Sequence, residues 1–448
     1  MAADAQGLPV TASNASAAAF DCAISDYLGW KGDPVAGLQS AVDNDPGFGL
    51  GSSAIASLFL QGGFRGDHPC VTAALCAAEQ ASAGATSREV LHLAGAKALA
   101  AGEISNAIQI WESILVGHPT DALALRFAHD GYFCLGQSLS IRDSIARVLP
   151  DWDPQGENYG YILGQYAFGL EEAGELRRAE EVAHAAIARN DGDGWAIHAI
   201  AHVLETESRQ TEGIAFLKAA RPAWRRAHAL AIHNGWHLAL YLIEEERFDE
   251  VLADYDQHVA PKLAGDFLLD LVDASALLWR LELAGADVGD RWAPLANQWL
   301  THVDDHVLVF NDLHIALAAS RAGNQLGIER LRRSLDHYAR DGRGDNRNIT
   351  ADVGRRLIDG VLAFAEGAYA RAVELLQPVR YNAVRIGGSH AQRDLITQTL
   401  IAAAERAGQL NLTRALLAER FAIRPTDRTR QHYVRAGGTA VAHPLRQR

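Results

Sequence analysis

The chain has 448 residues, of which 48% are hydrophobic, and this is enough apolar surface for a large core. Its 41 Lys and Arg are outnumbered by 55 Asp and Glu, which gives a formal net charge of -14 without any basic block. Nucleic acids and anionic membranes bind clustered positive charge, so neither partner is expected, and a small molecule or a protein is. The first twenty residues lack the pattern of a signal peptide, and no stretch approaches the ~18 apolar residues of a membrane span. We therefore expect a cytoplasmic protein.

The cysteines give no sign of a disulfide framework or a zinc motif. There are four, without the paired short spacing of such sites: Cys22, Cys70, Cys76 and Cys134. Each lies in an apolar, helix-like stretch. We expect reduced thiols in the core.

Two segments share one helix-turn-helix template. The first, GAKALAAGEISNAIQIWESILVGHP, begins at Gly95, and the second, YAFGLEEAGELRRAEEVAHAAIARND, begins at Tyr166. Each has a turn glycine, an alanine where the second helix packs closely, and a terminating residue: Gly102, Ala107 and Pro119, then Gly174, Ala179 and Asp191. The two alanines are 72 residues apart (179 - 107), close to two tetratricopeptide units of ~34 residues. The same step again reaches Val251, in a third copy.

The repeats predict an all-α fold, an α-α superhelix of tetratricopeptide-like helix pairs, roughly nine to eleven in number. Alternating apolar runs of strand length are almost absent, which leaves little room for β structure. We expect one domain over 1–448, with tails at 1–15 and 436–448 and a polar loop near 341–348.

Histidine is the informative residue, with eighteen in the chain. His198, His202 and Glu205 are spaced i, i+4 and i+7, so they share one face of a helix. The next repeat places His233 and His237 at i and i+4, with Asn234 and Trp236 beside them.

Similar polar side chains recur on other helices of the array. They are His129 and Asp130 in FAHDGYF, Asp270 and Asp273 in LLDLVDASALLWRL, and Asn311, Asp312 and His314 in VFNDLHIALAAS. GGSHAQRD adds His390, Gln392, Arg393 and Asp394, after Ser389 and Gln392 that resemble a capping box. In register, most of these residues fall in the first half of the first helix of a pair, which lines the concave wall of such superhelices.

Each residue alone has a structural interpretation, as a satisfied core histidine, a helix cap or a surface charge. Their number favours a network, because every unpaired buried polar group costs about 1 to 3 kcal/mol. We therefore predict a polar ligand pocket inside the superhelix channel.

The predicted roles divide the pocket into three sets. The catalytic set is His129, Asp130, His233, His237, Asp312 and Arg393; the substrate-binding set is Asn234, Trp236, Asn311, His314, His390, Gln392 and Asp394; the metal set is His198, His202 and Glu205. A metal there would be divalent, such as zinc or manganese. Without a metal, the same groups fit acid-base catalysis, with a histidine as base and Arg393 as anion partner.

In order and spacing, FDCAISDYLGW, HPTDALALRFAHDGYF, WAIHAIAHVLE, IHNGWHLALYLIE, FNDLHIALA and IGGSHAQRD resemble the tetratricopeptide repeat protein 38 family. The resemblance covers nearly the whole chain and implies a soluble, intracellular α-solenoid, but no defined activity. Animal members carry Asn where this chain has His390, so the resemblance does not imply an essential role for that histidine.

Two functions follow from these residues. The first is an enzyme, a hydrolase or acid-base catalyst that acts on a small polar molecule in the channel. The alternative is a scaffold that holds a protein or peptide in its concave groove, as repeat solenoids commonly do. A third interpretation is that the polar network only fixes the register of the helices.

Overall fold

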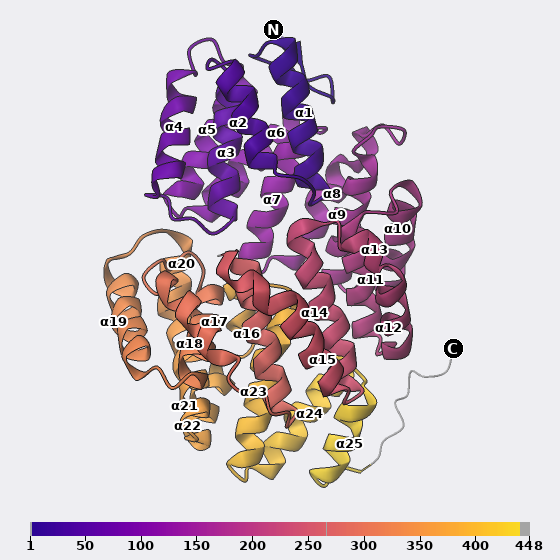
Figure 1. Ribbon diagram of the computed structural model, residues 1–448, viewed down its shortest axis with the longest axis vertical. Coiled ribbons are helices and arrows are strands. Elements are labelled where there is room, and N and C mark those ends of the chain that lie inside the picture. Colours follow the sequence, from indigo (N-terminus) through magenta and orange to yellow (C-terminus); the bar gives the residue numbers. More distant parts are fainter. Residues whose placement is uncertain (1, 266, 440–448) are drawn as a thin grey trace.

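The computed structural model describes residues 2–265 and 267–439, and helices form nearly all of this part of the chain (Figure 1). A short antiparallel ladder joins β1 (Ala2–Ala3) to β2 (Pro9–Val10). The first helices are α1 (Asn14–Leu28), α2 (Pro34–Asn44), α3 (Gly49–Gln61), α4 (Pro69–Gln80), α5 (Ser87–Ala100), α6 (Ile104–Gly117), α7 (Ala122–Cys134) and α8 (Ser138–Val148).

The middle of the chain contributes the helices that surround the polar interior. They are α9 (Tyr159–Glu172), α10 (Leu176–Arg189), α11 (Gly194–Thr206), α12 (Gln210–Ala219), α13 (Arg221–Trp224), α14 (His228–Glu244), α15 (Phe248–Asp254) and α16 (Leu268–Leu283). The last are α17 (Trp292–Trp299), α18 (Val309–Arg321), α19 (Gln325–Asp341), α20 (Gly344–Ile349), α21 (Arg355–Ala365), α22 (Tyr369–Leu376), α23 (His390–Arg406), α24 (Leu410–Ile423) and α25 (Asp427–Arg435).

The fold is an all-α solenoid of tetratricopeptide-like helix pairs, as predicted. In the two template segments, α5 packs on α6 and α9 packs on α10. The turn glycines Gly102 and Gly174 have φ of 77° and 83°, a left-handed conformation that glycine adopts without the penalty of a side chain. Ala107 and Ala179 are fully buried, so the small side chains let the paired helices approach closely.

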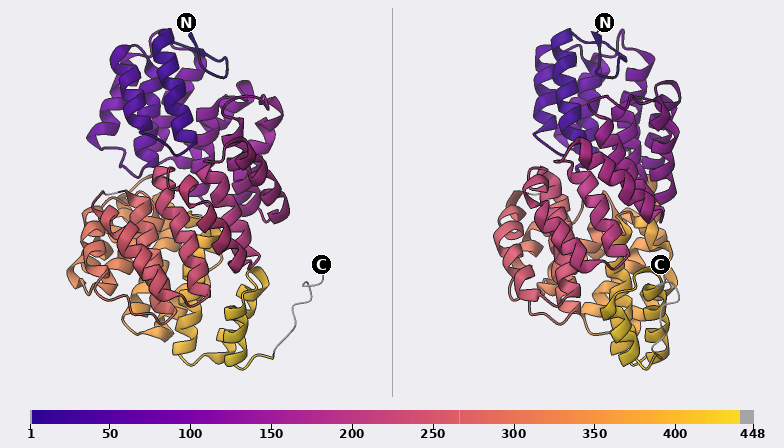
Figure 2. Two further views of the ribbon diagram at one scale, coloured as in Figure 1. Left: turned by 45° about the vertical axis from the view of Figure 1, so that its right-hand side comes forward. Right: turned by 90° about the vertical axis from the view of Figure 1, so that its right-hand side faces the viewer.

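The solenoid curls back on itself, so that helices far apart in the sequence meet (Figures 1 and 2). The backbone N–H and the hydroxyl of Ser105, at the start of α6, both donate to the carboxylate of Asp345, at 2.8 and 3.0 Å. This carboxylate caps a helix 240 residues away, where the helix dipole favours negative charge. A second contact between segments far apart in the sequence is that of α23 with α16.

Several sequence expectations need correction. Of the tail expected at 1–15, the described residues 2–15 do not form a simple tail, since Val10 is fully buried and Asp4 forms a buried ion pair with Arg88. The expected loop at 341–348 is largely α20. The cysteines are free, but Cys22, Cys70 and Cys76 are exposed and Cys134 is half-buried, because each lies on the outer side of its helix. Of the tail expected at 436–448, residues 440–448 lie outside the described residues.

Among the described residues, no helix combines the length and the apolar character that crossing a membrane would require.

We expect Gly344→Ala to destabilise the closure between α20 and the α5–α6 turn. A β-carbon at Gly344, which has φ of 78°, would lie 2.2 Å from the Gly102 carbonyl oxygen. The matched control is Gly367→Ala, since Gly367 also has φ of 78° but no atom lies within 4 Å of the added carbon. Urea unfolding should show a loss for Gly344→Ala that exceeds the control by about 1 to 3 kcal/mol, as for overpacking. Equal losses would mean that this contact does not contribute to stability.

Candidate functional site

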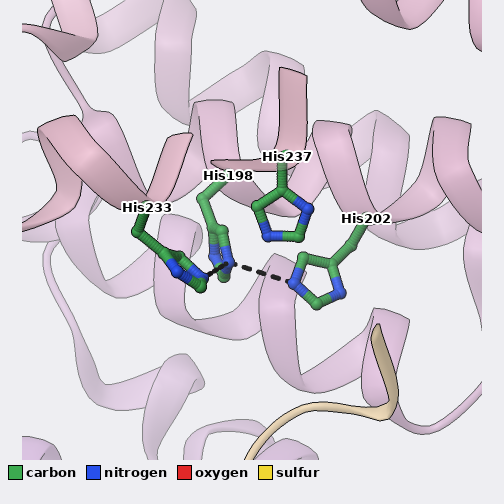
Figure 3. Close-up of side chains that lie close together, drawn as sticks. All are labelled: His198, His202, His233 and His237. Carbon is green, nitrogen blue, oxygen red and sulfur yellow. Dashed lines mark hydrogen bonds between the residues drawn. The ribbon is translucent and has the colours of Figure 1, made fainter. Parts of the chain in front are cut away.

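Four histidines from two neighbouring helices meet in the interior. His198 and His202 lie one turn apart on α11, His233 and His237 lie one turn apart on α14, and the four rings face one another (Figure 3). Each offers a ring nitrogen, and these four nitrogens lie within 4.8 Å of one another. All four residues are buried, with at most 5% of their surface exposed. We call them the four-histidine cluster.

The hydrogen bonds inside the cluster cannot all be satisfied. Nε2 of His198 lies 3.0 Å from Nε2 of both His202 and His233. A neutral imidazole has one N–H, so His198 can donate well to only one of these neighbours. Nδ1 of His198 and Nε2 of His237 are buried without any hydrogen-bond partner. The cluster therefore presents an excess of nitrogen lone pairs to one point.

Two buried carboxylates orient the α14 histidines from behind. Nδ1 of His233 lies 2.8 Å from Asp273 on α16, and Nδ1 of His237 lies 3.3 Å from Glu205 on α11. A carboxylate fixes the proton on the nitrogen that faces it, so the Nε2 lone pair is left available. This carboxylate–histidine arrangement is typical of the surroundings of a metal ligand.

Aromatic rings close the cluster on its inner side. The Phe168 and Trp195 rings lie 5.3 and 4.9 Å from the His198 ring, and Trp236 stacks on His233 with centroids 5.4 Å apart. Burial, followed by the neighbouring histidines, lowers the pKa of His198 and His237 well below its ordinary value. The rings of these two histidines are therefore neutral at physiological pH, which is the form that binds a metal.

A second group of charged side chains adjoins the cluster. Glu171 and Glu172 end α9, His390 begins α23, and with His202 they offer ligand atoms within 4.8 Å of one another. Nε2 of His390 lies 2.5 Å from Glu171, and its backbone N–H donates to Glu172 at 2.9 Å. Burial by itself raises the pKa of Glu171, but His390 and His202 outweigh it and hold that pKa below its usual range.

Arginines from the end of the chain cover this second group. Arg424 donates to Glu205 at 2.5 Å and lies 2.6 Å from Nδ1 of His390. Arg420 donates to Asp394 at 2.9 Å, and Arg424 lies 3.5 Å from the same carboxylate. The C-terminal helices thus bring positive charge to a site built mainly by α9, α11 and α14.

Other predicted residues also surround the cluster, but in supporting positions. Asn234 donates to the carbonyl of Gly194 at 3.3 Å. Gln392 forms the predicted capping box with Ser389, which is confirmed. Arg393 bonds the carbonyl of Gly388 and lies 3.6 Å from Glu172.

The structure places His129 and Asp130, predicted as catalytic, apart from the cluster. The His129 ring lies between Phe168 and Trp195, both its nitrogens lack hydrogen-bond partners, and burial lowers its pKa. Asp130 accepts from Arg126 at 2.9 Å and from Tyr27 at 2.8 Å. The apolar wall separates these residues from the four histidines.

The α18 residues also form contacts of their own. Asp312 lies 3.0 Å from Nδ1 of His306, whose Nε2 lies 2.8 Å from the Ser334 hydroxyl. His314 bonds the carbonyl of Phe310 one turn earlier, and Asn311 is half-buried. The predicted ring of ligands therefore divides into the cluster near α11 and a separate network at α18.

Sequence reasoning did not select Glu171, Glu172, Arg424 or Arg280 for the site. The two glutamates stand just before a turn glycine, where charged residues usually face solvent, and Arg424 follows the last residue of α24. Arg280 is buried and donates to the carbonyls of Ala391 and Gln392 at the start of α23. α9 packs directly on α11, whereas Arg424 reaches α11 only because the solenoid closes.

The residues present fit a transition metal. Imidazole nitrogens suit zinc, copper, iron and nickel, and zinc–nitrogen bonds measure about 2.0 to 2.1 Å. Glu205, predicted as a ligand, faces His237 and Arg424, and the four ring nitrogens that converge belong to His198, His202, His233 and His237.

Metal-free protein should lose stability as the pH falls. The unfolded chain binds protons on histidine near pH ~6.5, whereas folded His198 and His237 resist protonation, so the unfolded state gains more protons. The melting temperature should therefore fall between about pH 7.5 and 5.5, and less steeply in His237→Gln. His337→Gln is the control, because that side chain is 74% exposed. A slope in His237→Gln equal to that of the unmodified chain would contradict this assignment.

Comparisons with known proteins add a structural likeness. No family model matches the chain. Among solved structures it is similar to one titled "Crystal Structure of the Yeast Tom70", with a TM-score of 0.35, 13% sequence identity and coverage of 95% of each chain. The side chains of the site itself therefore carry the functional argument.

Proposed function

We propose that this protein is a metal-dependent enzyme whose metal ligands are His198, His202, His233 and His237. The observation that carries the proposal is the convergence of four buried imidazoles, with ring nitrogens within 4.8 Å of one another. Neutral nitrogens packed this closely, with too few N–H donors to pair them all, are costly unless a cation binds them. On the motifs quoted above, we also infer kinship with the tetratricopeptide repeat protein 38 family.

The surroundings support a metal over a purely structural network. A register-fixing network would pair each polar atom, yet Nδ1 of His198 and Nε2 of His237 have no partner. Asp273 and Glu205 sit behind two of the four rings, where they raise the basicity of the ligating nitrogen. Zinc fits a site of nitrogen donors best, and manganese or iron would use the adjoining carboxylates as well.

The reaction we propose is hydrolysis of a small polar substrate. A bound divalent metal would supply a water of lowered pKa, about 7 for zinc, and would polarise a carbonyl or phosphoryl oxygen. His390 is 26% exposed and so lies at the solvent edge of the buried site. Arg393 and Arg424 add positive charge on the same side, which favours a substrate with an anionic group.

A protein or peptide partner is the second candidate. The observation that favours it is a cleft of about 730 Å³ between α3, α5, the segment 304–307, α19 and α20, whose lining includes the exposed side chain of Phe64. If this cleft binds a peptide, Phe64→Asp should abolish stoichiometric co-purification of the partner and leave the metal content unchanged. Co-purification that survives the substitution would exclude the cleft.

Purified protein should contain metal, and the content should depend on the cluster. Inductively coupled plasma mass spectrometry should detect a transition metal in the unmodified chain and a large loss in His233→Ala. Asp273→Asn should retain the ligands but weaken the metal affinity by about 10 to 100-fold, as for other outer-shell partners. His337→Ala, at an exposed position, is the control.

The proposal would be contradicted if His233→Ala retained all of its metal. It would also be contradicted if the unmodified protein held no metal after supplementation with zinc, manganese and iron. For the activity itself, amide, ester and phosphoester substrates should be hydrolysed by the metal-loaded chain, and a chelator should remove the hydrolysis reversibly. Hydrolysis that survives the chelator, with the metal gone, would exclude the metal from the reaction.

A further inference from the structure

We propose that the centre holds two metal ions, and that the second lies between Glu171, Glu172, His390 and the Nδ1 edge of His202. This inference rests on the proposed function, because it adds a second ion beside the four-histidine cluster. The two sets of ligand atoms share one residue, His202.

His202 faces both sites with opposite edges of one ring. Its Nε2 lies 3.0 Å from Nε2 of His198, inside the cluster, and its Nδ1 lies 3.2 Å from Oε2 of Glu171, in the second group. A ring held in this way bridges the two ions. The ions would be farther apart than the ~3.5 to 4 Å of sites bridged by single oxygen atoms.

Two atoms of the second group are buried without hydrogen bonds. Oε2 of Glu171 and Nδ1 of His202 approach within 3.2 Å, yet neither has a hydrogen-bond partner. Both side chains are fully buried, with no exposed surface. A cation between these two atoms would bind both of them. A hydrogen bond with poor geometry pairs neither of them well.

The second group also concentrates two carboxylates, which are ligands for a divalent cation. The side chains of Glu171 and Glu172 are 0% and 2% exposed, so two consecutive carboxylates are withdrawn from water. Near them are His390 and, 3.6 Å from Glu172, Arg393. Glu171 is paired with His390, and Glu172 with Arg393 and the Ser138 hydroxyl; a divalent ion would bind both carboxylates at once and take over part of this charge balance.

Metal binding changes the proton inventory of the two histidines. On binding an ion through Nε2, His390 would carry its one proton on Nδ1 in place of Nε2, without net release, and Arg424, which now faces Nδ1, would turn to Glu205 and Asp394, which it already contacts. His202 would lose its ring proton to solvent on bridging the ions. Occupancy of the second position should therefore release protons and weaken as the pH falls.

The two positions differ in access to solvent. The four histidines of the inner position are at most 5% exposed, whereas the His390 side chain in the outer position is 26% exposed. Closed metal sites usually serve structure, and sites with an open position serve catalysis. We therefore place the substrate on the more exposed outer side, next to the ion that the four histidines would hold.

The test is a metal count on the full chain. Chelator-treated protein is titrated with zinc, desalted, and measured by inductively coupled plasma mass spectrometry. We expect two zinc ions per chain in the unmodified protein and one in Glu172→Gln and in His390→Ala. Glu175→Gln is the matched control, because Glu175 lies three residues after Glu172 in the sequence but pairs with Arg142 at the surface.

The outcomes separate this inference from the proposed function. One ion in the unmodified chain, retained in Glu172→Gln, overturns the second position and leaves the first. No bound ion overturns both. Loading with copper(II) gives an independent readout: two ions joined by His202 should show an exchange-coupled signal in electron paramagnetic resonance, and Glu172→Gln should show an uncoupled one. The metal-free variants should melt at a temperature close to that of the metal-free unmodified chain, which verifies that they fold.

Discussion

Removing four imidazoles and their carboxylate partners from water is the constraint that organises this structure. A buried polar atom without a partner costs about as much as several well-packed methyl groups contribute, so the interior must balance each one. Asp273 and Glu205 balance His233 and His237 from behind. Within the described part of the chain, the inward-facing nitrogens of these two histidines have no carboxylate partner, and their common direction makes them one site.

The same constraint explains why the solenoid closes. A linear array of helix pairs needs contacts only between neighbours, and its ends are free. Here the first turn of α23 returns to the end of α9, where the backbone N–H of His390 donates to Glu172 across 218 residues of sequence. Arg424 then reaches Glu205 on α11. Without this return, Glu171 and Glu172 would lie at the rim of an open groove, exposed to water.

The sequence predicts the fold well because the signals are local. The turn glycines, the small residues at helix crossings and the i, i+4 pairs act within one helix pair, so they could be interpreted without knowledge of tertiary contacts. The same locality predicted that His198 pairs with His202 and His233 with His237. It could not show that Glu205 turns toward His237 and Arg424, because that direction depends on the neighbouring helix and on the chain's end.

Equal spacing of polar residues in the repeats also misled the prediction. His129 and Asp312 occupy positions in their helices that match those of the cluster, so register alone placed them in one ring. In the structure, Phe168 and Trp195 enclose His129, while His306 pairs with Asp312. Which polar residues share a site depends on the aromatic side chains between them, and such packing has no periodic signal.

A centre that draws on α9, α11, α14 and α23 alters how the array holds together. In an ordinary solenoid each repeat adds stability through its two neighbours, and unfolding can begin at either end. The candidate ligands lie between residue 171 and residue 390 in the sequence, so a bound ion would connect distant repeats. In the proposed centre an ion would bind only when these helices are assembled, so its binding free energy would add to that of folding and would make the middle of the chain one cooperative unit. The last helices, which would otherwise fray as an end repeat, are then stabilised by the site that they complete.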